Sequence, residues 1–226
     1  MKEYLLKVLD TKKLSSGVAT IRFKPNKMME FKPGQFINIY LEGTKKPAAA
    51  YSIASPPDKD YIEISVKPVG EFSNKLCNVK VNEVIKAKGP FGHFYLDENK
   101  DAVLIAGGIG ICPFKSMVDY AIKKKLKNNI TLLYSCRTPN EIIYYDNLKS
   151  IREKNIKAVF TVTRYEGKDW RGESGRINKE MIKKYVKDLN NSVFYICGLR
   201  NMAEDIKNIL KKLNVSDGNI RVEAWG

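Results

Sequence analysis

The chain has 226 residues, of which 43% are hydrophobic; this is enough for the core of one large domain or two small ones and excludes a disordered chain. The formal net charge of +15 is spread over both halves, which fits a lysine-rich composition and also favours acidic partners or anionic ligands. No pattern of a nucleic-acid-binding module is present, so we expect no nucleic-acid partner.

The four cysteines, Cys77, Cys112, Cys136 and Cys197, form no Cys-x-x-Cys pair. The spacings typical of zinc sites, redox pairs and iron–sulfur clusters are therefore missing, and we expect no metal site. The longest apolar stretch, Ala102–Phe114, is too short and too rich in glycine to span a bilayer, and no signal peptide is recognisable. We therefore expect a cytoplasmic protein without a membrane span.

Residues 1–97 show the short apolar/polar alternation that is typical of strands. The predicted strands are Tyr4–Leu9, Val18–Phe23, Phe36–Leu41, Tyr51–Ala54, Tyr61–Val66 and Val84–Ala87, and one helical turn is expected at Phe72–Cys77. Six short strands at this spacing predict a small antiparallel barrel or sandwich.

From residue 101 onward, predicted strands alternate with amphipathic helices. The strands are Ala102–Ala106, Ile130–Ser135, Ala158–Thr163, Val193–Cys197 and Ile220–Glu223, with helices near 113–125, 141–153, 178–189 and 200–213. This alternation predicts a parallel five-stranded sheet with crossover helices. We expect two domains, residues 1–98 and residues 99–226.

A glycine turn joins the first of these later strands to its helix. Gly108 and Gly110 remove side chains where a ligand must come close, and Pro113 suits the first helical turn. Strand, glycine turn and helix in this order set backbone N–H groups against a phosphate. The pattern Gly-x-Gly-x-x-Pro differs from the Gly-x-Gly-x-x-Gly of the Rossmann fingerprint. The alternative to a phosphate-binding turn is a buried strand that simply ends in a glycine turn.

Four other motifs accompany this turn: Tyr51-Ser-Ile-Ala-Ser55, Gly70-Glu-Phe-Ser-Asn-Lys-Leu76, Cys197-Gly-Leu-Arg-Asn-Met202 and Val222-Glu-Ala-Trp-Gly226. Together, over nearly the whole chain, they resemble the ferredoxin–NADP⁺ reductase family of flavoenzymes. The resemblance implies a six-stranded antiparallel β-barrel that binds flavin, followed by an α/β domain that binds NAD(P). It implies FAD as cofactor, with FMN as an alternative, in the cleft between the two domains.

On the flavin side, the resemblance implies that Tyr51 packs on the isoalloxazine ring and that the Ser52 hydroxyl lies near its N5 atom. The remaining flavin-binding residues implied on this side are Ile53, Val69, Gly70, Phe72 and Ser73. Alternatively, the segment with Tyr51 is an ordinary strand whose tyrosine points inward. The alternative for Gly70–Leu76 is a simple helix with Ser73 as its N-cap.

The chain departs from the family at one position on this side. Ala49 stands where the family has an arginine that neutralises a flavin phosphate, and Lys45 or Lys46 is a candidate replacement. The departure leaves the choice between FAD and FMN, and the tightness of flavin binding, open.

On the nucleotide side, the resemblance implies that Gly108, Gly110 and Pro113 hold the pyrophosphate. Thr163 and Arg164 match a family pair near the adenosine ribose, and the guanidinium of Arg137, like that of Arg164, suits a 2′-phosphate. The arginines favour NADPH, while NADH and a plain surface role for the arginines stay open. His93, the one histidine, is expected to be a turn residue.

Around the nicotinamide, the resemblance implies that Gly198 and Met202 bind the cofactor and that Cys197 lies beside the ring. Trp225 would cover the flavin where the nicotinamide lands, and Glu223 would sit near the reacting edge. Alternatively, Cys197 is only a small buried residue at the end of a strand, and Trp225 is a surface residue that fixes the last strand.

These features predict an NAD(P)H-dependent flavin oxidoreductase in which Ser52, Cys197 and Glu223 form the catalytic contact. Electrons would pass singly to a separate acidic carrier, such as a ferredoxin, or to an oxygenase component. The alternative is a non-catalytic or complex-dependent electron-transfer subunit with a weakened flavin site. It is motivated by Ala49 and by Leu199 and Arg200, which replace two prolines of the family's Cys-Gly-Pro-Pro-x-Met motif.

Overall fold

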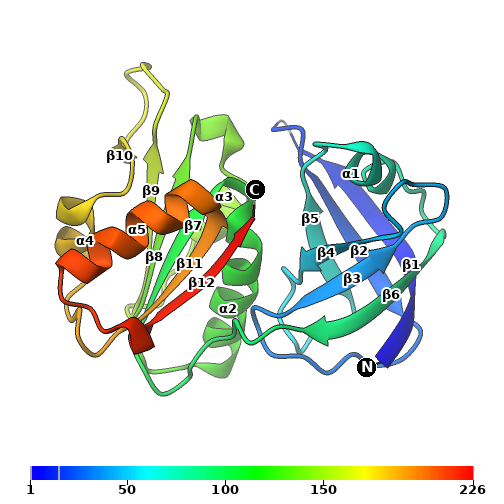
Figure 1. Ribbon diagram of the computed structural model, residues 1–226, viewed down its shortest axis with the longest axis horizontal. Coiled ribbons are helices and arrows are strands. Elements are labelled where there is room, and N and C mark those ends of the chain that lie inside the picture. Colours follow the sequence, from blue (N-terminus) through cyan, green and yellow to red (C-terminus); the bar gives the residue numbers. More distant parts are fainter. Residues whose placement is uncertain (1, 15, 226) are drawn as a thin grey trace.

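The computed structural model describes residues 2–14 and 16–225 and consists of two halves that lie side by side (Figure 1). The first half contains β1 (Lys2–Lys13), β2 (Ala19–Pro25), β3 (Phe36–Tyr40), β4 (Ala48–Ser52), β5 (Ile62–Val66), α1 (Glu71–Leu76) and β6 (Val84–Phe91). Its strands form one antiparallel sheet in the order β4-β3-β6-β1-β2-β5, which confirms the predicted six-stranded barrel.

The barrel core follows from the alternation of side chains along each strand. In β1, Tyr4, Leu6 and Val8 are buried while the residues between them are exposed. β5 differs, because all five of its residues are buried. The outward-facing members of this strand, Glu63 and Ser65, are therefore covered by the second half of the molecule.

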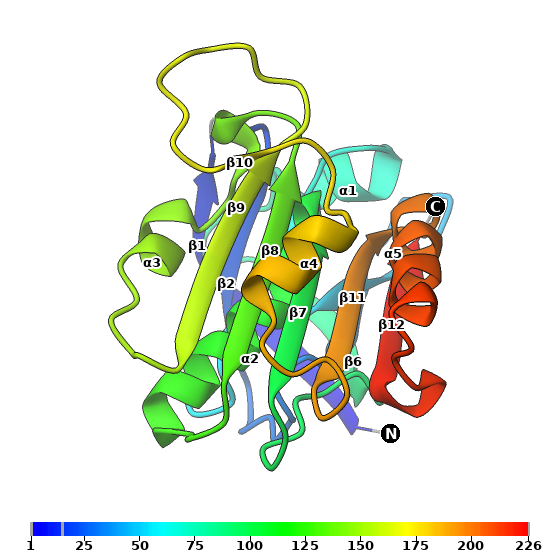
Figure 2. The same ribbon diagram turned by 90° about the vertical axis from the view of Figure 1, so that its left-hand side faces the viewer.

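The second half contains β7 (Ala102–Gly107), α2 (Ile111–Lys124), β8 (Ile130–Cys136), α3 (Tyr145–Lys149), β9 (Ile156–Val162), β10 (Glu173–Ser174), α4 (Lys179–Tyr185), β11 (Val193–Leu199), α5 (Arg200–Lys212) and β12 (Ile220–Trp225). The sheet is parallel with the order β10-β9-β8-β7-β11-β12. The helices α2 and α3 pack on one face, and α4 and α5 on the other (Figure 2).

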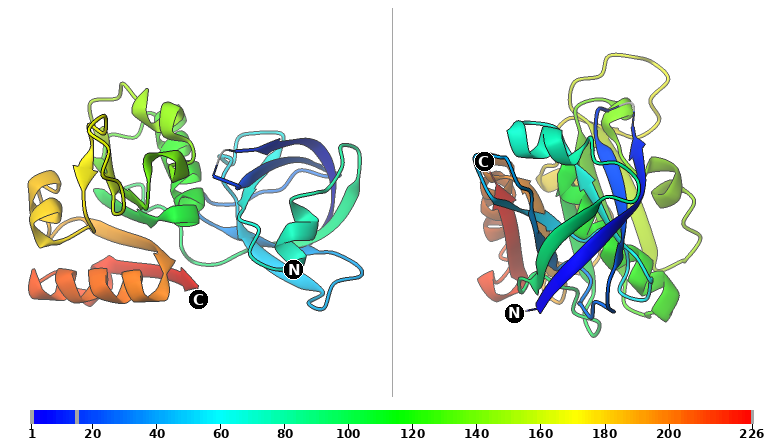
Figure 3. Two further views of the ribbon diagram at one scale, coloured as in Figure 1. Left: turned by 90° about the horizontal axis from the view of Figure 1, so that it is seen from above. Right: turned by 90° about the vertical axis from the view of Figure 1, so that its right-hand side faces the viewer.

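The order of the strands reverses between β7 and β11, so the loops that follow these two strands diverge and leave a crevice at the carboxyl edge. Seen from above, β12 runs along α5 and ends between the two halves (Figure 3). No helix in the described part of the chain is long and apolar enough to cross a membrane.

Three details of the prediction are corrected. The parallel sheet has a sixth strand, the two-residue β10, which is too short to leave a pattern. The helix expected over 141–153 is reduced to α3, because Ile142 and Ile143 are buried, Ile142 has an extended backbone, and Tyr144 is left-handed with φ of 60°. The strand expected at Tyr51–Ala54 begins earlier, at Ala48, because the alanine run pairs with β3.

The segment between the halves is fixed by buried contacts. The Tyr195 hydroxyl accepts hydrogen bonds from the Asp97 N–H (2.8 Å) and from Arg221 (3.0 Å), which anchors the segment to the sheet. Gly34, in the barrel, has φ of +107° and packs directly against the Phe94 carbonyl and the Met117 side chain of α2. A side chain at Gly34 would therefore push the two halves apart.

We expect Gly34→Ala to lower the free energy of unfolding by about 3 kcal/mol, since it combines backbone strain with overlap against two buried groups. The matched control is Gly17→Ala, where φ is +75° but a Cβ meets nothing within 4 Å. That variant should lose only about 1 kcal/mol from strain alone. Urea unfolding measures both values, and equal losses would contradict the packing argument.

Candidate functional site

A cleft of about 670 Å³ lies between the two halves and draws its walls from both. The predicted site residues that line it are Tyr51, Ser52, Val69, Ser73, Gly108, Arg137, Thr163, Met202 and Trp225. Residues far apart in sequence therefore meet at one place, at the carboxyl edge of the parallel sheet where the strand order reverses. The volume is in the ordinary range for a site that binds an organic cofactor.

The barrel wall presents a flat aromatic surface. The half-buried ring of Tyr51 stacks on Phe72, with 6.3 Å between ring centroids and an interplanar angle of 23°. Burial raises the pKa of Tyr51 to about 12, so its phenol stays neutral. Phe72 and Ile53 are buried beneath this surface and support it without lining the cleft. The arrangement suits the stacking of a planar ring on Tyr51.

The start of α1 is held by Ser73, the third residue of the helix. Its hydroxyl accepts hydrogen bonds from the N–H groups of Val69 (2.9 Å) and Gly70 (3.0 Å) and donates to the Gly70 carbonyl. The N-cap is Gly70, so the alternative in which Ser73 is the N-cap is wrong. A Cβ at Gly70 would meet nothing within 4 Å, so a ligand has room to approach the backbone there.

The glycines of the opposite wall have different roles. Gly108 has φ of +54° and open space where a Cβ would be, so its backbone is available to a ligand in the cleft. Gly110 contacts the Cys197 carbonyl, and its missing Cβ also leaves room for the Trp225 ring. Gly107 packs in the same way against the Met202 sulfur. Gly108 is therefore the member of this turn that fits direct ligand contact.

Two other residues predicted in this region are structural neighbours of the cleft. Pro113 is buried in the first turn of α2, and Gly198 packs near Gly107 and Met202. Neither belongs to the cleft lining. They fix the shape of the turn and of the loop after β11.

A second cavity of about 700 Å³ adjoins the cleft and shares Arg137, Thr163, Met202 and Trp225 with it. Four arginines line this second cavity, namely Arg137, Arg164, Arg176 and Arg200, against one carboxylate, Asp205. The ion pairs among residues 2–14 and 16–225 include none of these arginines. The cavity is therefore positively charged and fits an anionic group, and Trp225 stands where the two cavities meet.

Cys197 and Glu223 pair in register on β11 and β12, but neither belongs to the cleft lining. Burial raises the pKa of the Cys197 thiol well above its usual value, so it stays protonated. Burial also raises the pKa of Glu223 to about 7, and the buried Oε2 atom of Glu223 has no hydrogen-bond partner among the described residues. Glu223 is thus a carboxyl group that can hold or release a proton near neutral pH.

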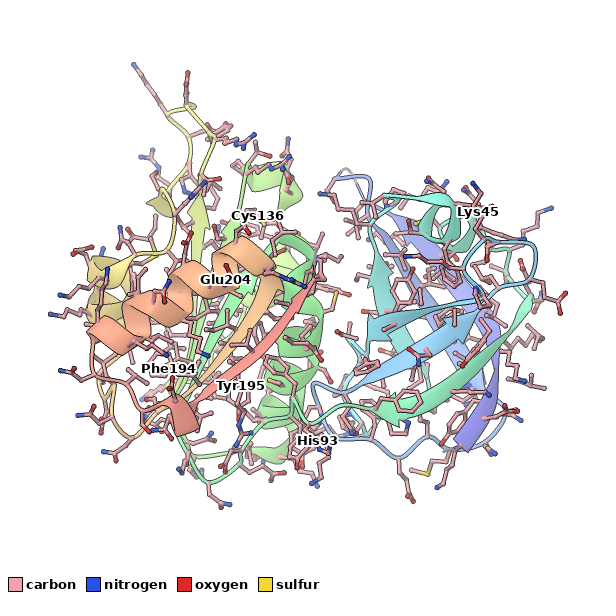
Figure 4. The ribbon with its side chains drawn as sticks, viewed as in Figure 1. Lys45, His93, Cys136, Phe194, Tyr195 and Glu204 are labelled. Atoms are coloured by element: carbon pink, nitrogen blue, oxygen red, sulfur yellow. The ribbon has the colours of Figure 1, made fainter. Side chains whose placement is uncertain are left out.

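Several residues that line the cleft were not predicted from the sequence, chiefly Ser65, Lys67 and Cys112. Ser65 lies in β5, and Lys67 directly follows this strand. Because side chains two residues apart along a strand point to the same face, this spacing could have placed both residues on one side of the barrel. Of the cations proposed to replace the family arginine, neither Lys45 nor Lys46 lines the cleft; Lys45 lies beside α1 (Figure 4). Lys67 is the lysine that the cleft contains.

His93 lies in the connecting segment at the lower edge of the molecule and is exposed (Figure 4). Among the described residues, no group of three or more His, Cys, Asp and Glu side chains is arranged to hold a metal ion.

The buried Glu223 carboxyl makes stability depend on pH. Its folded pKa of about 7 lies above the ordinary 4.5, so its contribution is full below about pH 4.5 and is lost as the pH rises through 7. From pH 5 to pH 8, we expect the unfolding free energy of the apoprotein to fall by about 2 kcal/mol relative to Glu223→Gln, after allowance for solvent screening. Chemical unfolding of both proteins at the two pH values measures the difference, and parallel pH dependences would contradict it.

The comparisons with known proteins agree with this geometry. The family model described as "Oxidoreductase FAD-binding domain" matches residues 5–95, and the one described as "Oxidoreductase NAD-binding domain" matches residues 104–208. The flavohemoprotein of Oceanobacillus iheyensis is 27% identical over 237 residues, which cover 97% of this chain and 58% of that protein. A component of the Na(+)-translocating NADH-quinone reductase of Idiomarina loihiensis is 26% identical over 211 residues, covering 84% of this chain and 52% of that component.

The chain thus spans about half the length of these curated relatives. Among solved structures, a ferredoxin NADP⁺ reductase from Neisseria gonorrhoeae with bound FAD and NADP has a TM-score of 0.86 at 23% identity, with 99% of each chain covered. The chain therefore belongs to the oxidoreductases with an FAD-binding and an NAD-binding domain, and it has the two-domain fold of ferredoxin–NADP⁺ reductases.

Proposed function

We propose that this protein takes electrons from a reduced nicotinamide dinucleotide through FAD and passes them singly to a carrier protein such as a ferredoxin, or to an oxygenase component. The observation that carries the proposal is the placement of Trp225 between the interdomain cleft and the arginine-lined cavity. One cavity suits a planar ring and the other suits an anionic nucleotide. The two ligands would meet at Trp225.

The residues of the cleft fit FAD. Tyr51 offers a stacking face, Ser52 offers a hydroxyl in the same wall, and Gly70 at the start of α1 leaves open space beside the backbone for a phosphate-bearing group. Lys67 supplies a positive charge in the cleft, which Ala49 does not. FAD, when bound, supplies the capacity to accept a hydride and to release electrons one at a time.

The work of the protein is then positioning and the exclusion of water. The Met202 sulfur packs on Gly107 and holds the loop after β11 close to the glycine turn. Trp225 lines both cavities where they meet, so it would have to move before a nicotinamide could reach a flavin bound in the cleft. Cys197 and Glu223 pair in register on the two strands that end at Leu199 and Trp225, so they flank this contact from outside the cleft lining. The Cys197 thiol stays protonated, and the Glu223 carboxyl can take up or release a proton near pH 7.

The arginine-lined cavity supports NADPH over NADH. Four guanidinium groups face one carboxylate there, and a 2′-phosphate would add a dianion that Arg137 and Arg164 can bind through paired hydrogen bonds. The 2′-hydroxyl of NADH carries no such charge. The two cofactors should therefore differ in affinity and differ less at high salt.

The surface around the cleft supports an acidic protein as the electron acceptor. The apolar side chains of Val69 and Leu199 border the cleft from opposite halves and are 80% and 58% exposed. They lie on a chain with a formal net charge of +15. Attraction between opposite charges would speed the encounter with an acidic carrier, and the rate should fall as salt is added.

Ala49 favours a second candidate function, a subunit that holds flavin weakly and works only inside a complex. Ala49 packs against the barrel core on β4 and carries no charge toward the cleft. One relative is itself a subunit of a larger enzyme. Purified protein that stays colourless after FAD is added would favour this second function.

We expect anaerobic addition of NADPH to the FAD-loaded protein to bleach the flavin absorbance, with NADH needing about tenfold higher concentration because it lacks the 2′-phosphate. Arg164→Ala should remove most of this difference without changing the response to NADH. Absorbance near the flavin band measures the reaction. A bound flavin that neither nucleotide bleaches would reject the proposed function.

Trp225→Ala should tighten NADP⁺ binding about tenfold, because the nucleotide no longer has to displace the indole ring. Val222→Ala is the matched control, since Val222 lies on the same strand, is 43% exposed and lines neither cavity. Calorimetric titration measures both affinities. Equal affinity in wild type and Trp225→Ala would show that the ring does not block the site.

A further inference from the structure

A row of hydrogen bonds crosses the boundary between the two halves. The Tyr144 hydroxyl, from the segment before α3, lies 2.5 Å from the Ser65 Oγ atom and 3.2 Å from the Glu63 Oε1 atom, both on β5. The other carboxylate oxygen of Glu63 accepts a hydrogen bond from the Arg22 Nε–H at 2.6 Å. Three groups that can exchange protons are therefore in line.

The donors in this row have one consistent direction. A carboxylate only accepts hydrogen bonds, so the single hydroxyl hydrogen of Tyr144 points to Glu63. The Tyr144 oxygen must then accept from Ser65, whose hydroxyl hydrogen points toward Tyr144. This leaves the lone pairs of the Ser65 oxygen free to accept a proton, and the row is ordered from Ser65 toward Glu63.

The two ends of the row open on different spaces. Ser65 lines the interdomain cleft, while Tyr144, Glu63 and Arg22 line another cavity of about 340 Å³ on the boundary between the halves. The Arg22 side chain at the outer end is 49% exposed, so this cavity communicates with solvent. The Tyr144 hydroxyl therefore connects the cleft to water.

The inner end lies close to the predicted reaction centre. The Ala54 N–H donates to the Glu63 carbonyl at 2.7 Å, so the chain after β4 runs beside β5 at this point. Ser52 lies two residues before Ala54, and Ser65 lies two residues after Glu63, on the neighbouring segment. Both serines line the cleft. The row thus begins next to the hydroxyl that the proposed function places at the flavin.

The conformation of Tyr144 shows that its position is strongly determined. Its φ of 60° is left-handed, which costs a bulky residue about 1–2 kcal/mol. The surrounding contacts compensate for this cost, and burial raises the pKa of the Tyr144 phenol well above its usual value. The phenol therefore keeps its proton and can pass one on only by receiving another at the same time.

We propose that Ser65, Tyr144 and Glu63 form a proton path between the interdomain cleft and solvent. The inference rests on the proposed function, since oxidation and reduction of a bound flavin release and take up protons. In the outward direction, a proton reaches the Ser65 oxygen, the Ser65 hydrogen moves to Tyr144, and the Tyr144 hydrogen moves to Glu63. Glu63 then releases one proton to water, so the path carries one proton with no net change in its own groups.

Besides Glu63, the charged residues that line the outer cavity are Lys12, Arg22, Lys115, Asp119 and Asp146. Lys115 and Asp119 form an ion pair on α2, and the Lys115 ammonium lies 5.4 Å from the centre of the Tyr144 ring. Tyr61, whose ring lies under the Arg22 guanidinium, borders the same cavity.

The experiment uses FAD-loaded protein reduced with dithionite, freed of excess reductant, and mixed rapidly with ferricyanide in weak buffer containing a pH-indicator dye. The reduced flavin gives two electrons to two ferricyanide ions and releases its proton to water. Tyr144→Phe and Glu63→Gln should slow proton release at least about tenfold, since each keeps the side-chain shape but cannot pass the proton on. Glu63→Asp should retain faster release than Glu63→Gln.

The matched control is Tyr145→Phe, because Tyr145 is the next residue and packs by its ring on Phe160, with 4.9 Å between centroids. Thermal unfolding of each apoprotein and the affinity for FAD show whether a variant is merely distorted. Glu63→Gln provides the test if Tyr144→Phe does not fold.

Slow proton release in Tyr144→Phe and Glu63→Gln, with Tyr145→Phe unchanged and FAD affinity preserved, would support the path. Unchanged proton release in Glu63→Gln would overturn it. Equal slowing in Glu63→Gln and Glu63→Asp together with weaker FAD binding would also overturn it, since the row would then only hold the halves together. Dithionite makes the result independent of nucleotides, so failure of NADPH to bleach the flavin would reject the proposed function alone.

Discussion

The whole arrangement depends on one strand, β5 (Ile62–Val66), being buried on both of its faces. One face completes the barrel core, and the other lies against the nucleotide half. A polar side chain that is buried in this way needs a partner, because an unpaired one costs about 1–3 kcal/mol. Glu63 and Ser65 find their partner in Tyr144 across the boundary, so the pairing that satisfies the strand also sets the position of the two halves.

The cleft follows from the same constraint. The two halves touch along β5 and at Gly34 of the barrel, which packs on the Phe94 carbonyl and on Met117 of α2, and they leave a space of about 670 Å³ between them. On the far wall, the close packing of Gly107 on Met202 and of Gly110 on Cys197 draws the loops after β7 and β11 together. Gly108 is left as the turn residue with open space beside it, so its backbone is accessible to a ligand in the cleft.

The charged side chains are distributed unevenly between the two adjoining cavities. The cleft holds few charged groups, whereas four arginines gather in the adjoining cavity with one carboxylate. Separation of this kind lets a dinucleotide be attracted and anchored by its phosphates while its reactive ring enters a less charged space. Burial keeps the Cys197 thiol protonated and raises the pKa of Glu223 to about 7, and neither side chain belongs to the lining of the cleft.

Local patterns in the sequence determined the strands of the barrel, the alternating strands and helices of the second half, and the glycine turn. Alternation of apolar residues and strand–glycine–helix order are short-range signals, and the family resemblance extended them to Tyr51, Ser52 and Trp225, which the structure brings to one cleft. Those signals could not find Ser65, Lys67 or Tyr144, because their significance comes from what lies across the boundary. The tertiary structure alone decided that Lys67 is in the cleft while Lys45 and Lys46 are not, and that β5 is covered on both faces. The physical reason is that burial and pairing between distant segments depend on how the two halves pack, which no local spacing records.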